Sequence, residues 1–214
     1  QPLSFSVSET TEGVHIHIID AELMGKGEKE KKDLYIEGVQ NNGIINHYEY
    51  IINSEGTIEI RHVLKPEGKM PLWFPRIGLT LTVSDALDQV KWYGRGPQEN
   101  YPDRKTGYPT GIYASTVQAM YEPYLMPQDY GLRTDVRWLQ LTTDKGIGLQ
   151  FKMNEWFNFN IYPYSTDNLT KAMYTYQLQK QKGMTLNLDY ATTGVGCTAR
   201  GVFGAYKAMP QEYR

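Results

Sequence analysis

Cysteine is almost absent from the sequence: Cys197 is the single one in 214 residues, so no disulfide bond can form within the chain. No apolar run approaches the ~20 residues that a membrane-spanning helix requires. The formal net charge is only −2, which gives no electrostatic basis for attracting nucleic acid or a membrane surface. We therefore expect no nucleic acid and no membrane among the partners of this chain.

Segments with the 3.6-residue periodicity of an amphipathic helix are also missing, apart from a short helix-start signal at Ser165–Leu169. Apolar residues instead alternate with polar ones, which is the period-two pattern of half-buried strands. We predict hairpin turns at Gly13, Ser54–Gly56 and Asp144–Gly146, and a solvated loop in the charged run 25–33. The expected fold is all-β, with antiparallel strands in two packed sheets.

The chain lacks the common catalytic signatures. It has no nucleophile elbow, no H-E-x-x-H zinc motif, no phosphate-binding loop and no dinucleotide-binding fingerprint. Asn154-Glu155 matches an acid/base pair of some retaining glycosidases, but that pair requires a βα-barrel, and the strand pattern predicts none. We therefore interpret the pair as a coincidence and predict no catalytic residue and no cofactor in this chain.

Two histidines, His15 and His17, lie two residues apart on one face of a predicted strand. This spacing occurs in some metal sites. The sequence indicates no third ligand near them, so we interpret the two side chains as part of an exposed polar face and predict no metal site.

The most distinctive stretch is Trp92–Arg104, where a strand ends and a loop rich in glycine, proline and aromatic residues begins. Glycine permits backbone conformations and close approaches that other residues cannot adopt, and Pro97 fixes its own φ. One interpretation is a structural corner in which Asp103 and Arg104 form local hydrogen bonds. The other is a loop that lines a ligand site. The composition favours the corner.

A second polar stretch contains Arg133, Asp135 and Arg137 at alternate positions of a predicted strand. Alternation would place all three side chains on one face, with a carboxylate between two guanidiniums that suit bidentate pairing. We interpret this stretch as an ion-pair ladder that fixes a corner.

Taken together, the two stretches resemble signatures of the C-terminal "small chain" domain of glycoside hydrolase family 2 β-galactosidases. The first is similar to W-[YL]-G-x-G-P-x-E-x-Y-x-D-R, and residues 127–138 are similar to P-[QS]-[ED]-x-G-x-R-x-[DG]-x-R. Further similarities lie at Pro75–Gly78, Leu186–Asp189 and Gly194–Gly196. The matched structural positions are Trp92, Gly94, Gly96, Pro97, Glu99, Tyr101, Asp103, Arg104, Arg133, Asp135 and Arg137.

This resemblance implies an antiparallel β-supersandwich of the galactose-mutarotase-like type, with residues 1–214 as one domain truncated at both ends. It implies a larger bacterial enzyme, cytoplasmic or periplasmic, that hydrolyses terminal β-galactosides. A separate βα-barrel domain of the same chain would carry both catalytic glutamates, so the fragment alone would be inactive. The alternatives are a non-catalytic carbohydrate-binding module and a purely structural or oligomerisation domain.

In the family, the loop after Gly194–Gly196 supplies a tryptophan that packs on the sugar. Gly201 stands at that position here, and Cys197 and Thr198 replace a glycine and an aspartate of the family pattern. The resemblance thus implies that this loop helps to shape the pocket for a β-galactoside or related carbohydrate. The candidate substrate-binding residues are Thr198, Arg200 and Gly201. The alternative is a loop that only docks on the barrel domain.

Overall fold

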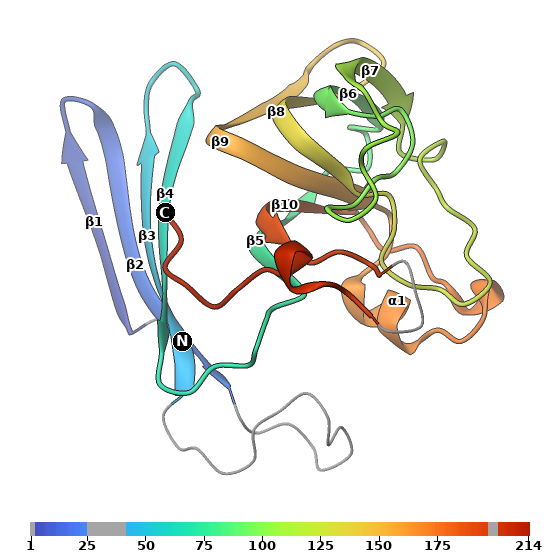
Figure 1. Ribbon diagram of the computed structural model, residues 1–214. Helices are drawn as coiled ribbons and strands as arrows, with labels where there is room; N and C mark the ends of the chain where they lie inside the picture. Colours follow the sequence, from blue (N-terminus) through green and yellow to red (C-terminus); the bar gives the residue numbers. More distant parts are fainter. Residues whose placement is uncertain (1–2, 25–41, 197–200) are drawn as a thin grey trace. The chain divides into compact units, whose positions relative to one another are not determined.

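The computed structural model describes residues 3–24, 42–196 and 201–214 (Figure 1). Backbone contacts divide the chain into two compact units, one of Gln1–Phe74 with Met209–Arg214 and one of Pro75–Ala208. The long elements of both units are antiparallel strands, so the predicted all-β fold with two antiparallel sheets is confirmed. The assignment of 1–214 to a single domain stays a prediction, and the charged run 25–33 lies outside the described residues.

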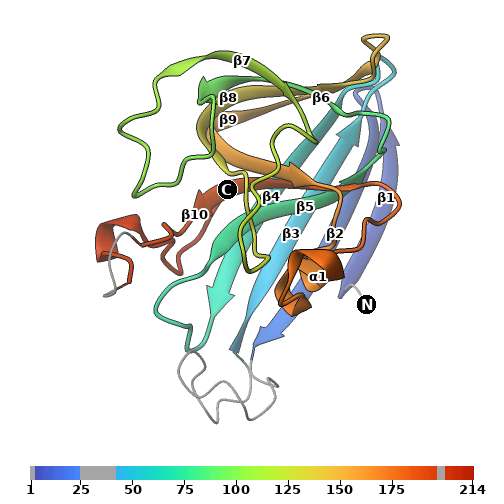
Figure 2. The ribbon, with the colours of Figure 1, turned by 90° about the vertical axis from the view of Figure 1, so that its right-hand side faces the viewer.

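The first unit is a four-stranded sheet whose strands lie side by side in chain order, β1-β2-β3-β4 (Figure 2). Two predicted turns are confirmed, because Gly13 and Gly56 occupy them with positive φ values of 139° and 82°. The Asn53 side chain fixes the second turn by accepting hydrogen bonds from the backbone N–H groups of Glu55 and Thr57, both at 3.0 Å. The strands are β1 (Ser4–Thr10), β2 (Gly13–Met24), β3 (Asn42–Ile52) and β4 (Ile58–Glu67).

The second unit is a six-stranded sheet in the order β5-β10-β9-β8-β6-β7. Its first strand along the chain, β5, pairs with its last, β10. Gly146, with a φ of 79°, turns β8 into β9 as predicted. The predicted helix start is also confirmed, because the Ser165 side chain accepts a hydrogen bond from the N–H of Asn168 at 3.0 Å. The elements are β5 (Arg76–Val83), β6 (Gln89–Arg95), β7 (Thr110–Thr116), β8 (Arg133–Thr142), β9 (Gly148–Tyr162), α1 (Thr166–Lys171), β10 (Met184–Thr192), and 3-10 turns at Thr175–Gln177 and Gly204–Tyr206.

The core of the second unit is built by apolar side chains that alternate along its strands. Trp92 is 1% exposed and packs edge-on against Phe159, with ring centroids 5.9 Å apart. Its indole Nε1 donates to the carbonyl of Arg95 at 3.0 Å. Burying a side chain of this kind stabilises the fold by ~1.5–3 kcal/mol, so Trp92 anchors the end of β6 where the corner begins. Other members of this core are Val90, Val136, Leu139, Leu141, Phe157, Ile161 and Leu186.

Candidate functional site

The corner Trp92–Arg104 leaves β6 through two glycines whose backbone packs directly against neighbouring strands. A Cβ atom on Gly94 would lie 2.8 Å from the Cγ2 methyl of Val136 on β8. A Cβ atom on Gly96 would lie 2.8 Å from the ring of Tyr113 on β7, and the following Gly96–Pro97 peptide bond is cis. No larger side chain fits at either position, which explains both glycines of the motif.

Glu99 is the centre of the corner, because it is 4% exposed and its carboxylate accepts four hydrogen bonds. Oε2 accepts from the Tyr101 hydroxyl at 3.1 Å and from the Gly131 N–H at 2.8 Å. Oε1 accepts from the Arg104 guanidinium at 2.7 Å and from the Tyr124 hydroxyl. Burial alone would raise the pKa of Glu99, but these donors outweigh it and leave the pKa lowered. A charged carboxylate thus ties the corner to the segment before β8.

Asp103 connects the corner to the start of the loop after β10. Its Oδ1 accepts a hydrogen bond from the N–H of Val195 at 3.1 Å, and its Oδ2 accepts one from the N–H of Gly196 at 2.7 Å. A Cβ atom on Gly194 would lie 2.4 Å from the Asp103 Cγ, so glycine is needed for this approach. The predicted local hydrogen bonds are confirmed for Arg104 but wrong for Asp103, whose partners lie more than ninety positions away in the chain.

Asp135 does not lie between the two predicted guanidiniums. Its φ is 54°, and the β8–β9 register shifts on both sides of Val136, so the alternation on which the prediction depended is broken. The Asp135 carboxylate pairs instead with Nε of Arg95 at 2.5 Å and with Nζ of Lys105 at 2.8 Å. Burial would raise the pKa of Asp135, but these two partners outweigh it and leave the pKa lowered. Asp135 therefore fixes the corner, though with other partners than predicted.

Arg133 and Arg137 occupy separate environments. Arg133 is 3% exposed, donates to the Gly131 carbonyl at 2.9 Å and stacks over the Trp92 ring at 5.4 Å. Burial lowers the pKa of Arg133 to about 10. Arg137 stacks over the Trp156 ring at 4.2 Å and donates to the backbone carbonyl of Asp135. The prediction that Arg133, Asp135 and Arg137 form an ion-pair ladder on one face of the strand is therefore wrong.

A second buried polar network, which sequence reasoning missed, lies where β10 and β9 meet the start of β5. Asp189 is 1% exposed and pairs with Nη2 of Arg76 at 3.0 Å. Asn160 accepts from the same guanidinium at 3.3 Å and donates to Asp129 at 2.9 Å, while the Tyr162 hydroxyl contacts Asp129 at 3.1 Å. Burial raises the pKa of Asp189 to about 7 despite the Arg76 charge. The sequence signal that could have revealed this network is the pair of segments Pro75–Gly78 and Leu186–Asp189, which resemble the family and contain Arg76 and Asp189.

The loop after β10 holds the candidate sugar contacts, of which Thr198 and Arg200 lie outside the described residues. Gly201 is described: its φ is 82°, and among the described residues other than its chain neighbours no atom lies within 4 Å of the position that a Cβ would take. The base of the loop is fixed by a hydrogen bond from the N–H of Gly194 to the Tyr206 carbonyl at 2.8 Å. Beyond Gly201, Phe203 is 63% exposed. Gly201, with open space beside it, and the exposed Phe203 ring therefore lie close together in the chain, on a loop whose base is anchored.

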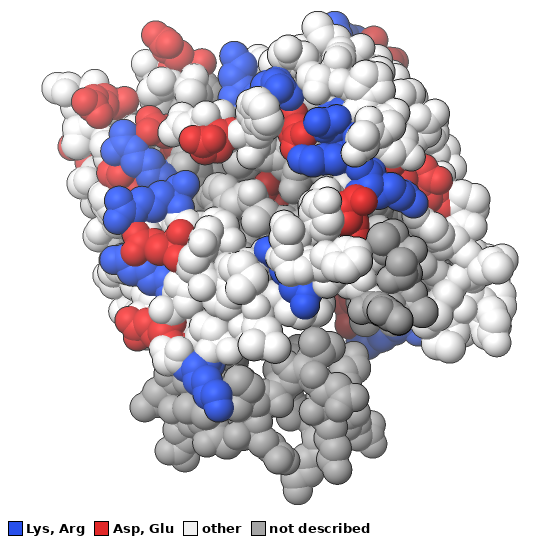
Figure 3. Space-filling model, in the orientation of Figure 1, with Lys and Arg blue, Asp and Glu red and all other residues white. Residues whose placement is uncertain are grey.

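Charges of both signs are interspersed on the face drawn in Figure 3, without a large area of one sign. Within the described residues, no helix is long and apolar enough to cross a membrane.

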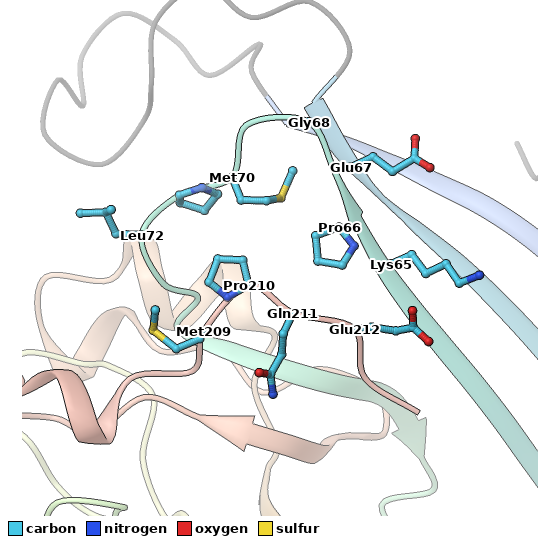
Figure 4. Close-up of a pocket in the computed structure, with 11 residues that line it drawn as sticks. Lys65, Pro66, Glu67, Gly68, Met70, Leu72, Met209, Pro210, Gln211 and Glu212 are labelled. Carbon is cyan, nitrogen blue, oxygen red and sulfur yellow. The ribbon is translucent and has the colours of Figure 1, made fainter.

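A hollow of about 680 Å³ lies within the first unit, between the end of β4 and the C-terminal segment (Figure 4). Its lining includes three prolines and two methionines, and the side chains of Lys65 and Glu67 extend away from it. Such a lining offers no convergent polar groups for a substrate. The residues that line it are Lys65, Pro66, Glu67, Gly68, Met70, Pro71, Leu72, Met209, Pro210, Gln211 and Glu212.

Asn154 and Glu155 lie in the middle of β9, and both are exposed. They are not at the end of a barrel strand, where a glycosidase acid/base would be held. The buried carboxylates Glu99 and Asp189 and the half-buried Asp135 each pair with donors from separate segments of the second unit. The arrangement is suited to positioning the loop after β10.

Comparison with known proteins gives a match over almost the whole chain. A family model described as the β-galactosidase small chain matches residues 7–214. Among curated proteins, a β-galactosidase of Priestia megaterium (strain DSM 319 / IMG 1521) is 38% identical over 147 residues, which is 69% of this chain and 14% of that protein.

Two further relatives give the same picture. A β-galactosidase of Vibrio cholerae is 39% identical over 122 residues, covering 57% of this chain and 11% of that protein. A β-galactosidase of Pseudoalteromonas haloplanktis is 34% identical over 148 residues, covering 69% of this chain and 14% of that protein. The matched region thus spans only 11–14% of the length of these relatives.

Proposed function

The chain belongs to the β-galactosidase small-chain family, and from this premise we propose that it is a domain of a retaining glycosidase that hydrolyses terminal β-galactosides. The observation that carries the proposal is the family match over residues 7–214, together with relatives named β-galactosidase. Because the match covers 14% of the first relative, we assign the two catalytic glutamates to a βα-barrel domain elsewhere in the parent chain.

The role that we propose for this domain is to present the loop 194–203 to the sugar. Asp103 holds the base of that loop through two backbone N–H groups. Thr198 and Arg200 are the candidate polar contacts, and the open space around Gly201 leaves room for a ring. Phe203 offers an apolar face of the kind that packs on the C–H face of a pyranose, in place of the family tryptophan.

A non-catalytic carbohydrate-binding role is favoured by a different feature. Tyr174 and Tyr176 stack with ring centroids 5.5 Å apart and an interplanar angle of 7°. They are 57% and 80% exposed, so their outer faces are open to solvent. Exposed aromatic rings are suited to packing on sugar faces, so this pair is the candidate contact for a carbohydrate in the non-catalytic role.

The main proposal is tested with the full-length protein that contains this chain. We expect turnover of aryl β-galactosides well above that of the matching β-glucosides. Phe203→Ala should raise KM about fivefold with little change in kcat, since stacking on a ring contributes ~1 kcal/mol to binding. Leu125→Ala, at a residue that is 95% exposed, is the control and should leave both constants unchanged.

Two results would contradict this assignment. A full-length protein that cleaves β-glucosides but not β-galactosides would overturn the substrate class. A Phe203→Ala variant with unchanged KM would overturn the role of the loop and leave the family membership intact.

A further inference from the structure

We propose that His15, His17 and Glu49 form a binding site for a divalent transition metal ion, with zinc as the best match. The three side chains lie on one face of the four-stranded sheet, because His17 on β2 is directly opposite Glu49 on β3 and His15 is two positions along the same strand. Their candidate ligand atoms all lie within 4.8 Å of one another. This inference is independent of the sugar that the parent enzyme binds.

The distances suit a tetrahedral ion. Nδ1 of His15 lies 3.4 Å from Oε1 of Glu49, and Nε2 of His17 lies 3.7 Å from the same oxygen. Ligands held ~2.0–2.1 Å from zinc at tetrahedral angles are ~3.4 Å apart. Small side-chain movements would therefore bring the three atoms onto one ion. His17 is 50% exposed, so water can reach a fourth position.

Neighbouring side chains prepare Glu49 to act as a ligand through one oxygen. Nη1 of Arg61 on β4 donates to Oε2 of Glu49 at 3.0 Å, which leaves Oε1 directed at the histidines. Nε of Arg61 also donates to Glu59 at 2.7 Å, so its charge is shared between two carboxylates. Partners of this kind orient a metal ligand from the second layer.

His15 is the more enclosed of the two histidines, because its side chain is 13% exposed against 50% for His17. The other ring nitrogen of His15, Nε2, is buried without a hydrogen-bond partner among the described residues, so no second protein group fixes this ring.

The ligand types determine the class of ion. Two imidazoles and one carboxylate suit zinc, cobalt, nickel and copper, whereas magnesium and calcium prefer oxygen ligands throughout. The ion would join β2 to β3 across the sheet, and we therefore assign it a stabilising role. The sequence alone did not reveal this site, because the third ligand reaches the two histidines only through the strand register.

The test uses the full-length protein, stripped of metal with a chelator and titrated with Co²⁺, whose visible absorption reports its coordination. The ligand variants are His17→Gln and Glu49→Gln. The matched control is His47→Gln, because His47 lies two residues from Glu49 on the same strand and outside the ligand set. We expect the wild type and the control to bind one more Co²⁺ per chain than either ligand variant, and Zn²⁺ to displace that Co²⁺.

Equal cobalt stoichiometry and affinity in all four proteins would overturn the site. Melting curves of the metal-free proteins show whether each variant is folded. Should a ligand variant fail to fold, X-ray absorption on the zinc-loaded wild type decides: imidazole ligands to one additional zinc ion support the site, and zinc without imidazole ligands refutes it. A melting temperature that rises on adding zinc to the wild type and the control alone is the expected signature of cross-strand stabilisation.

Discussion

The contact between Asp103 and the loop after β10 gives a sharp test of how the candidate sugar loop is held. We predict that Asp103→Ala frees the N–H groups of Val195 and Gly196, which now donate to its carboxylate at 3.1 and 2.7 Å. The magnitude follows from the number of bonds. Hydrogen bonds to a charged group contribute ~1.5–3 kcal/mol each, and partial exposure places this pair at the lower end. The local opening free energy should therefore fall by ~2–3 kcal/mol.

Amide hydrogen exchange measures this opening directly, without requiring two-state unfolding of a large protein. Since 1.4 kcal/mol corresponds to a factor of ten, exchange at Val195 and Gly196 should accelerate ~30- to 140-fold. Asp144→Ala removes an exposed carboxylate from the β8–β9 turn and should leave these amides unchanged.

Gly194→Ala provides the second arm of a double-mutant cycle. Its new Cβ would lie 2.4 Å from the Asp103 Cγ, so the carboxylate has to withdraw and both hydrogen bonds are lost. The effects of Gly194→Ala and Asp103→Ala should then overlap, and the double variant should exchange little faster than either single one. Unchanged exchange in Asp103→Ala, or fully additive effects in the cycle, would refute this account of the anchor.

Two other predictions concern the second unit. Burial raises the pKa of the Asp189 carboxyl to about 7 from an ordinary value of 3.8. Between these two pH values the folded state holds a proton that the unfolded state has lost. The stability that this group contributes is therefore full below about pH 4 and is lost as the pH rises to about 7. The melting temperature of Asp189→Asn should lack that decline, and equal pH slopes would contradict it. Gly96→Ala should lower stability by ~1–3 kcal/mol, since its methyl would meet the Tyr113 and Trp92 rings at 2.8 and 3.0 Å; an unchanged denaturation midpoint would contradict it.

The strands and hairpins could be predicted because their causes are local. Alternation of apolar residues decides which side of a strand faces the core, and turn residues such as Asn53 and Gly146 bond or bend within a few positions of themselves. The N-terminal cap of α1 at Ser165 is likewise contained in four residues. Patterns of this length can be recognised in a single sequence.

The polar contacts could not be predicted in the same way. Alternation placed Arg133, Asp135 and Arg137 on one face, but a left-handed residue at Asp135 rotates the strand and sends each side chain elsewhere. An irregularity of one residue turns the following side chains of the strand to the opposite face of the sheet. The sequence does not reveal where a bulge will be tolerated, because that depends on the strand alongside.

Contacts between side chains and groups far apart in the chain could not be predicted either, for a related reason. Asp103 reaches Val195 only because β6 and β10 belong to one sheet, and Glu49 reaches His17 only through the register of β2 and β3. The resemblance to a family identified the segments concerned without indicating which atoms they join. Side-chain partners follow from topology, and topology is fixed by the packing of the whole sheet.

The strand order of the second unit bears on how this chain is made. Among the described strands β5 pairs with β10 alone, and Met184 follows Val83 by 101 positions. During synthesis at ~5–20 residues per second, β5 therefore waits ~5–20 s with both edges unpaired. In that interval the nascent chain presents a template for pairing with other chains. A ribosome that stalls before Met184 would release a protein prone to aggregate, whereas one that stalls after Thr192 would release a chain in which β10 can pair with β5.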